Sequence, residues 1–325
     1  MVTVRVLISG STGFVGRALL EHLAAYPEFE LRAAIRGDAR PAATKVATVR
    51  IADIAAGTDW REALRGVHVV IHLAARVHVM REGAHDSLTQ FRAVNTAGTL
   101  NLADQAAQAG VRRFIFLSTI GVNGAETHGA AFTASDRVAP HSAYAVSKCE
   151  AEVGLQDIAR RTGLQVVILR PPLVFGADAP GNFGQLVAWV KRGTPLPLAC
   201  VHNRRSLVAV ENLCDLIRIC ITHPLAANET FLVSDDEDLS TPQLLRYVGS
   251  ALGKPVRLFP VPVGLLRFAA TMLGRRTTAQ SLCGSLQVDV EKTRRLLDWT
   301  PQFNVAAALE RMAQKMVAGT RTAAR

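Results

Sequence analysis

Three glycines near the N-terminus constrain the fold most strongly. Gly10, Gly13 and Gly16 stand between a β-rich run at 4–8 and a helical pattern that starts at Val15. Glycines at a strand-to-helix turn permit a tight turn, close approach of the backbone to a pyrophosphate and close helix packing. The GxxGxxG spacing differs from the commoner GxGxxG, and glycines alone would indicate only a turn. Placed between strand and helix, they predict a dinucleotide-binding loop of Gly10, Thr12, Gly13, Phe14, Val15 and Gly16.

The rest of the first half alternates β-rich runs with helical patterns. Such alternation predicts a parallel sheet with right-handed crossovers. The unbroken apolar run at 165–169 suits a central strand that is buried on both faces. The sequence therefore predicts an α/β fold with a doubly wound parallel (Rossmann) sheet. Its expected strands are 4–8, 30–35, 51–54, 67–73, 113–118 and 165–169, with helices near 60 and at 88–109 and 143–161.

Beyond Arg170 the sequence pattern changes, because prolines and glycines repeatedly interrupt the apolar runs. We therefore predict a dinucleotide-binding domain over 1–170, to which segments near 206–234 return. A smaller α/β region over 171–325 is expected to bind the substrate. Within it, Ser240 and Pro242 predict the capped start of a helix over 242–252.

Composition excludes several classes of protein. The chain has 325 residues, 49% of them apolar and 20% charged, which is enough for one large core or two coupled ones. Its net charge of +10 is scattered rather than gathered in basic blocks with aromatics, so nucleic-acid binding is not expected. Five cysteines without CxxC spacing favour neither a disulfide framework nor a metal site. Reduced cysteines, and the lack of a signal-peptide pattern, predict a cytoplasmic protein.

One late stretch, 258–274, is strongly apolar. It is shorter than a bilayer span, contains Arg267 and is interrupted by Pro260 and Pro262, so membrane insertion is not expected. The pattern predicts a buried or interfacial helix, with contact to a membrane surface as the alternative.

The end of the second expected strand bears on cofactor choice. Arg36 stands where many dinucleotide folds place a carboxylate for the ribose, and an arginine there can accommodate a 2′-phosphate. Arg36, with Arg40 nearby, favours NADP(H), whereas Asp38 leaves NAD(H) open. Asp53, followed by Ile54, is placed to accept a hydrogen bond from the adenine amino group; the alternative is an ordinary turn aspartate.

The candidate catalytic residues lie further along. Tyr144 and Lys148 are four residues apart, so in a helix they share one face. A lysine charge and an oxidised nicotinamide would both favour the phenolate of Tyr144, which could then exchange a proton with a carbinol or carbonyl oxygen. Thr119, after Ser118 at the end of a strand, can give that oxygen a second hydrogen bond. Each motif alone is weak, but together with the glycine loop they predict an NAD(P)-dependent oxidoreductase.

These motifs resemble the extended short-chain dehydrogenase/reductases, the NAD-dependent epimerase/dehydratase family, over nearly the whole chain. The resemblance also rests on His72-Leu73-Ala74-Ala75, on 94–99 and on 170–176. It implies that Leu73, Ala74, Ala75, Asn95, Ser118, Pro171 and Val174 bind the cofactor. It further implies a UDP-sugar substrate, bound by Arg76, Thr119, Asn182, Phe183, Leu196, Arg205 and either Arg275 or Arg276. Arg205 is the expected diphosphate ligand, and His78 would help Arg76 to enclose the sugar.

Departures from the family pattern narrow the expected chemistry. The 4,6-dehydratases carry an Asp-Glu pair after the catalytic threonine, but Ile120 and Gly121 follow Thr119 here. The chain is most similar to bacterial UDP-4-keto-6-deoxy-N-acetylhexosamine 4-reductases of surface-polysaccharide pathways, by segments 76–80, 196–208 and 284–289. Arg36 and the proline-rich 171–173 also favour a net ketoreductase.

Three alternatives stay open. A UDP-sugar 4-epimerase with tightly held NAD would use the same residues. A ketoreductase of apolar substrates is disfavoured by Arg204 and Arg205. A non-catalytic dinucleotide sensor would have no need of Thr119, Tyr144 and Lys148. The resemblance also implies a homodimer through the helices at 88–109 and 143–161.

Overall fold

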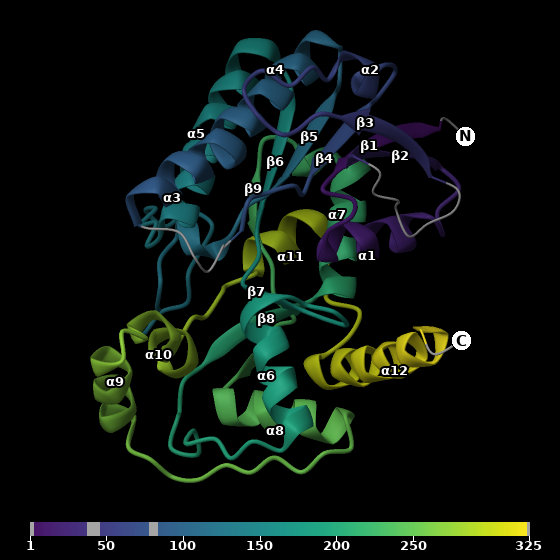
Figure 1. Ribbon diagram of the computed structural model, residues 1–325. Coiled ribbons are helices and arrows are strands. Elements are labelled where there is room, and N and C mark those ends of the chain that lie inside the picture. Colours follow the sequence, from purple (N-terminus) through teal and green to yellow (C-terminus); the bar gives the residue numbers. More distant parts are fainter. Residues whose placement is uncertain (1–2, 38–45, 78–83, 324–325) are drawn as a thin grey trace.

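A seven-stranded parallel sheet with helices on both faces forms the upper part of the molecule (Figure 1). The computed structural model describes residues 3–37, 46–77 and 84–323. The strand order is β3-β2-β1-β4-β5-β6-β9, and every neighbouring pair is parallel. This order confirms the predicted doubly wound sheet, with β9 added beyond β6. The strands are β1 (Val4–Ser9), β2 (Phe29–Arg36), β3 (Ala47–Ile51), β4 (Val69–His72), β5 (Arg113–Leu117), β6 (Gln165–Arg170) and β9 (Thr230–Leu232).

Alternate side chains of the central strands serve two separate cores. Val6 and Ile8 of β1 pack with α1 (Phe14–Leu23) and α7 (Val210–Thr222) on one face. Leu7, between them, joins the opposite cluster with α2 (Arg61–Leu64), α4 (Thr99–Gln108) and α5 (Ala143–Thr162). This is the two-residue period of a strand that is covered on both sides. The covering helices hold the carboxyl ends of the strands at one edge, where the glycine loop lies.

The helix predicted over 88–109 has three parts. It runs as α3 (Ala84–Phe91), a π-helical segment η1 (Arg92–Gly98) and α4. The Thr99 hydroxyl donates to the Asn95 carbonyl at 2.7 Å inside this segment. Gly98 also lies so close to Ile54 that a side chain there would meet it at 2.7 Å. Single wide turns of this kind often occur at functional sites.

A second, three-stranded sheet of order β10-β8-β7 supports the lower part of the molecule. Its core contains Phe175, Phe183, Leu207, Leu245 and Leu309. The remaining elements are β7 (Leu173–Phe175), β8 (Arg205–Ala209), β10 (Asp238–Leu239), η2 (Ile120–Val122), η3 (Pro224–Ala226), α6 (Gly181–Arg192), α8 (Thr241–Ala251), α9 (Val263–Met272), α10 (Arg276–Cys283), α11 (Glu291–Leu297) and α12 (Val305–Ala323).

The predicted cap of α8 is confirmed. Of the two forms predicted for the apolar stretch 258–274, a buried helix or an interfacial one, the buried form is wrong for α9. Ser240 accepts from the Gln243 backbone, and the Gln243 side chain accepts from Ser240 in return. None of the α9 residues is buried. Within the residues that the structure describes, no helix combines the length and the apolar character that crossing a bilayer requires.

Candidate active site

The glycine loop forms a close-packed cradle at the start of α1. Gly10 has φ of 75°, and a side chain on it would lie 2.5 Å from the backbone nitrogen of Ala74. Gly16 is pressed against the backbone of Gly10 and Ser11 in the same way. Gly13 caps α1 without a side-chain hydrogen bond, so the first N–H groups of the helix face the loop. Such a cradle fits an anionic pyrophosphate.

A chain of hydrogen bonds ties this loop to the neighbouring strand. His72, fully buried at the end of β4, contacts the Ser9 hydroxyl at 2.6 Å and the Thr99 hydroxyl at 2.9 Å through its two ring nitrogens. Burial, aided by the charge of Lys148, lowers the pKa of His72 to about 3. His72 is therefore neutral at physiological pH and acts as a fixed link between β1, β4 and α4.

Asn95 joins the loop after β4 to α5. Its side-chain oxygen accepts from the Arg76 backbone at 2.8 Å, and its amide donates to the Arg76 carbonyl and to the Ser147 hydroxyl, both at 3.1 Å. Thr96 adds a bond to the Ser147 carbonyl at 2.8 Å. Both amide hydrogens of Asn95 are thus engaged inside the protein. The structure places Asn95 where it fixes the backbone of Arg76 against the helix that carries Tyr144.

Tyr144 and Lys148 lie on the first two turns of α5. Ser142 caps this helix by accepting from the Ala145 backbone. The Phe91 ring packs edge-on against the Tyr144 ring, with centroids 6.0 Å apart. The Lys148 ammonium donates to the Leu117 carbonyl at 2.8 Å and lies 4.3 Å from the centre of the Phe116 ring. The expected pairing on one helix face is therefore present, at the end of β5.

The electrostatics differ from the expectation that Lys148 lowers the pKa of Tyr144. Burial raises the pKa of Tyr144 to about 12, and burial lowers the pKa of Lys148 to about 7, against an opposing effect of Glu152. The physical reason is desolvation, since Lys148 directs its ammonium to the Leu117 carbonyl. The lysine alone does not generate a phenolate in this arrangement.

Thr119 follows β5 directly and caps η2. Its backbone is extended, and its hydroxyl oxygen accepts from the Gly121 backbone at 3.1 Å. Ile120 donates to the Pro171 carbonyl at 2.9 Å, which joins this turn to the loop after β6. Pro171 is buried, and Val174 of β7 is partly exposed in the same loop region. Thr119 thus lies where the carboxyl ends of β5 and β6 meet.

A buried ion pair behind Lys148 was not anticipated. Glu152, one turn after Lys148, pairs with Arg170, and their side chains are only 4% and 6% exposed. Arg170 also donates to the Asn123 side chain at 2.9 Å. Ser118, expected at the cofactor, instead donates its hydroxyl to Glu152. The sequence does hint at this arrangement, because Lys148 and Glu152 are four residues apart and therefore lie on one face of the helix.

Arg36 and Asp53 meet at the ends of β2 and β3. Arg36 donates to Asp53 at 3.0 Å, and both side chains are largely exposed. The Ile54 backbone also donates to Asp53, and this bond together with Arg36 holds the pKa of that carboxyl below its usual range. Arg36 was expected to bind a 2′-phosphate and Asp53 to bind the adenine. In the structure the two side chains instead bind one another. Asp38, Arg40 and His78 lie outside the described residues.

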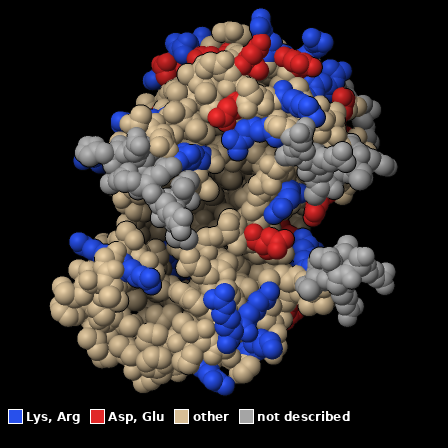
Figure 2. Space-filling model, viewed as in Figure 1, with Lys and Arg blue, Asp and Glu red and all other residues tan. Residues whose placement is uncertain are grey.

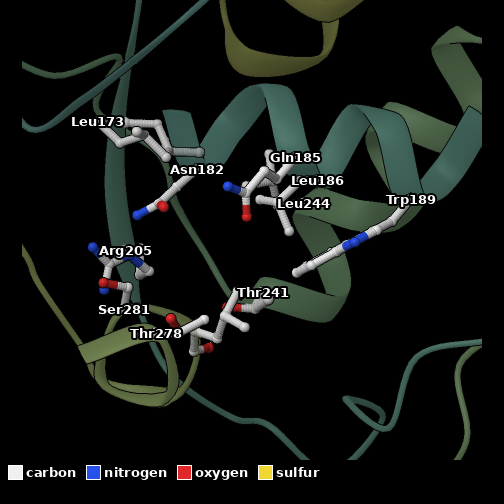
Figure 3. Close-up of a pocket in the computed structure, with 12 residues that line it drawn as sticks. Leu173, Asn182, Gln185, Leu186, Trp189, Arg205, Thr241, Leu244, Thr278 and Ser281 are labelled. Atoms are coloured by element: carbon white, nitrogen blue, oxygen red, sulfur yellow. The ribbon is translucent and has the colours of Figure 1, made fainter. Parts of the chain in front are cut away.

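A cavity in the lower part of the molecule gathers polar groups from distant elements (Figure 3). The space in it that water-sized groups can occupy is about 60 Å³, and the cavity is partly open to solvent. Figure 3 shows Asn182, Arg205 and Ser281 on one side and the Trp189 ring on the other. Arg205 donates to the Gly284 carbonyl at 3.0 Å, and burial lowers the pKa of its guanidinium, with Glu126 opposing. The lining residues are Leu173, Asn182, Gln185, Leu186, Trp189, Arg205, Leu207, Thr241, Leu244, Thr278, Ser281 and Leu282.

Two expected substrate residues are not at this cavity. The side chains of Phe183 and Leu196 are 1% and 7% exposed and belong to the core of the lower region. Both backbone groups of Leu196 also bond to the neighbouring segment, at Arg257 and Phe259. Burial contradicts the prediction for both side chains: Phe183 lies on the inner face of α6, Leu196 lies in the loop after that helix, and apolar side chains at such positions pack into the core.

The remaining expected substrate residues are spread around the cavity. Arg276 lines a second groove with Glu126 and Arg267, beside the cavity rather than inside it. Arg275 is the residue before α10. The structure therefore brings Asn182 and Arg205 together and leaves Arg275 and Arg276 at the rim. Leu173 of the cavity lining lies two residues after Pro171, whose carbonyl accepts from Ile120, the residue after Thr119. Figure 2 shows a hollow between the upper and lower parts on this face.

A doubly wound sheet with a glycine cradle and a Tyr-Lys pair at its carboxyl edge defines an oxidoreductase-type enzyme of the short-chain dehydrogenase/reductase class. Comparison with known proteins refines this class. Residues 6–234 match the NAD dependent epimerase/dehydratase family, and the chain belongs to that family.

Named relatives and solved structures agree with this assignment. The chain is 41% identical over 311 residues to a UDP-glucose 4-epimerase of Vibrio cholerae, covering 95% of this chain and 94% of that protein. The fold is similar to that of UDP-N-acetylglucosamine 4-epimerase from Bacillus cereus, with a TM-score of 0.78 and 19% identity over 97% of this chain and all of that one. UDP-glucose 4-epimerase from Thermotoga maritima, solved with UDP-glucose, has a TM-score of 0.76 and 19% identity over 98% and 99% of the two chains.

Proposed function

We propose that this chain is a 4-epimerase of a UDP-hexose that works by reversible oxidation at C4. The observation that carries the proposal is the link along the chain between the two groups: Leu173 lines the cavity of Arg205 and follows Pro171 by two residues, and the Pro171 carbonyl accepts from Ile120 beside Thr119. A nucleotide-sugar diphosphate held at Arg205 would extend its sugar toward Tyr144. The 41% identity to a UDP-glucose 4-epimerase supports epimerisation over the net reduction that the sequence favoured.

The residues divide the chemistry among themselves. The glycine cradle, with Leu73 to Ala75, would hold the dinucleotide, which supplies a hydride acceptor and donor when bound. Tyr144 takes and returns the proton of the C4 oxygen, and Thr119 gives that oxygen a second hydrogen bond. Lys148 stabilises the charge of the phenolate during the transfer. The residues after Thr119 are the buried Ile120 and Gly121, so no carboxylate stands there for water elimination.

A second candidate is a net 4-keto reductase, and Arg36 favours it. This arginine at the end of β2 suits the 2′-phosphate of an exchangeable NADP(H), and its ion pair with Asp53 would have to open first. In either case the enzyme is proposed to serve surface-polysaccharide synthesis as a cytoplasmic homodimer. All five cysteines are free, which fits a reducing compartment.

Product analysis by nuclear magnetic resonance separates the two candidates. Purified protein is mixed with UDP-glucose or UDP-N-acetylglucosamine, without added cofactor, and the C4 epimers are quantified. Formation of UDP-galactose or its acetamido counterpart supports the epimerase. Failure to interconvert either pair, with stoichiometric use of NADPH on a UDP-4-keto-6-deoxy-N-acetylhexosamine, would replace it with the reductase.

A further inference from the structure

Helix α9 is apolar on two opposite faces, although it lies on the surface. Its inner residues Val263 and Leu266 pack against the core of the lower region. Its outer residues Leu265, Phe268 and Met272 follow at helical spacing and are 57%, 62% and 69% exposed. A helix that is apolar all round is normally covered on both sides. The outer face of α9 therefore lacks a cover within the described chain.

The residues that flank α9 extend this surface. Phe259 before the helix and Leu273 after it are 44% and 74% exposed. We call the five exposed side chains the α9 patch: Phe259, Leu265, Phe268, Met272 and Leu273. Soluble monomers rarely gather large apolar side chains in this way without a binding purpose.

The chain segment that carries the patch has charged side chains of one sign only. Residues 239–288 contain six Lys or Arg and no Asp or Glu. The rest of the chain contains 31 Lys or Arg (37 minus 6) and 27 Asp or Glu. The six are Arg246, Lys254, Arg257, Arg267, Arg275 and Arg276. Glu126, from another segment, lines the groove beside Arg267 and Arg276. These two arginines outnumber the single carboxylate there, so the net charge of the groove is positive. In Figure 2 the lower left part, where Figure 1 places α9, is tan with blue side chains above it.

We propose that the α9 patch docks the enzyme on an anionic lipid bilayer. Apolar side chains flanked by arginines are the composition of helices that lie in a membrane interface, where aromatic and aliphatic groups enter the headgroup boundary and cations face the phosphates. A second copy of the chain fits less well, because two such faces would bring their positive charges together. The single short helix makes the contact reversible, and this inference is independent of the proposed chemistry.

Docking has a consequence for the cavity. Helix α10 follows α9 after only Leu273, Gly274 and Arg275, and it supplies Thr278 and Ser281 to the cavity lining. The two helices also pack against one another. A bilayer on the α9 patch would therefore lie beside the substrate cavity, where a membrane-bound enzyme could collect the product.

Co-sedimentation of the full-length protein with vesicles tests this inference. Vesicles of phosphatidylcholine alone are compared with vesicles in which a third of the lipid is phosphatidylglycerol, at low and high salt. The wild-type protein should sediment with the anionic vesicles at low salt and be released by high salt. Wild-type protein that stays in solution with anionic vesicles, or binds both compositions equally, would overturn the proposal.

Two variants identify the surface. Phe268→Glu should lower the partition onto anionic vesicles about ten-fold or more, whereas Leu225→Glu, at a side chain that is 56% exposed on η3, should leave it unchanged. The double variant Lys254→Gln, Arg257→Gln should weaken anionic binding in a salt-dependent way. Equal binding by the two glutamate variants contradicts the proposal. So does a wild-type dimer, seen by size-exclusion chromatography, that Phe268→Glu dissociates while no vesicle binding occurs.

Discussion

The catalytic edge of the large sheet and the cavity of the lower region hold their functional groups in different ways. At the catalytic edge Lys148, His72 and Glu152 are buried, and each is hydrogen-bonded to a partner of its own inside the protein. At the cavity, Arg205 is only partly covered, and the lining comes from β7, β8, α6, α8 and α10. Under the proposed function, the catalytic edge carries out the reaction and the cavity selects the nucleotide sugar. Changes in the two regions should therefore affect different kinetic constants.

The largest effect is expected from the catalytic edge. Tyr144→Phe removes the hydroxyl that exchanges a proton with the substrate, and kcat should fall about 10²–10⁴-fold. Cofactor affinity, measured by titration calorimetry, should change little because the ring remains beside Phe91. Turnover near the wild-type rate in this variant would remove Tyr144 from the mechanism.

The next effect concerns the glycine cradle. Gly10→Ala combines a left-handed backbone with a contact to Ala74, so the free energy of unfolding should fall by about 2–4 kcal/mol. Gly110→Ala is the matched control, since Gly110 has φ of 76° and open space around it. Gly110→Ala should lower the free energy of unfolding by about 1–2 kcal/mol. Urea denaturation of both variants measures the difference, and equal losses would show that close packing at Gly10 is unimportant.

The cavity is tested by Arg205→Ala. Loss of a charged hydrogen-bond donor to the diphosphate should raise KM for the nucleotide sugar about 10–100-fold, with a smaller change in kcat. Arg204→Ala, at the exposed neighbour, should raise KM less than about two-fold. If kcat fell instead and KM stayed constant, the proposed division between the two regions would be wrong.

Cofactor choice depends on Arg36. Arg36→Ala should raise the dissociation constant of NADPH about ten-fold and that of NADH less than about two-fold. Asp53→Asn is the control, because it releases the guanidinium from its ion pair without removing it, and NADPH should bind at least as well. Fluorescence titration gives both constants. Equal losses for the two cofactors in Arg36→Ala would exclude a role in selectivity.

The last prediction concerns the dependence of stability on pH. Lys148 has its pKa lowered to about 7 in the folded protein, from 10.5, so above pH 7 the unfolded chain binds more protons at this site. Stability from this group therefore rises with pH, up to about 1.4 kcal/mol per pH unit. In Lys148→Met, the free energy of unfolding should no longer rise in this way between pH 7 and pH 10.0, the ordinary pKa of the Tyr144 hydroxyl. Urea denaturation across this range checks it, and parallel curves for wild type and variant would contradict the burial of a titrating lysine.

The catalytic edge could be predicted from the sequence because its signals are local. Gly10, Gly13 and Gly16 act through the backbone between one strand and one helix, and Tyr144 with Lys148 needs only the helical period. The parallel sheet follows from the alternation of strands and helices with right-handed crossovers, whereas the order of its strands was not predicted. Burial could not be predicted there: it raises the pKa of Tyr144, and it brings the Ser118 hydroxyl to Glu152, which lies on another element.

The lower region could be predicted only in part. The family resemblance predicted Asn182 and Arg205, and both line the cavity, but the lining also includes Thr241 and Ser281, which tertiary packing alone brings together. Leu196 was misplaced because its sequence cannot distinguish a core position from a ligand contact. The exposed α9 shows the same limit, since hydropathy reports an apolar helix without reporting what covers it.

Isotope retention tests the central claim most directly. UDP-glucose and UDP-N-acetylglucosamine carrying deuterium at C4 are incubated with the enzyme and an excess of unlabelled free NAD(H). Epimerisation inside one active site predicts C4 epimers that keep the deuterium at C4, with none in the free cofactor. Deuterium that appears in the free cofactor pool, or the absence of any epimer from either substrate, would contradict the account.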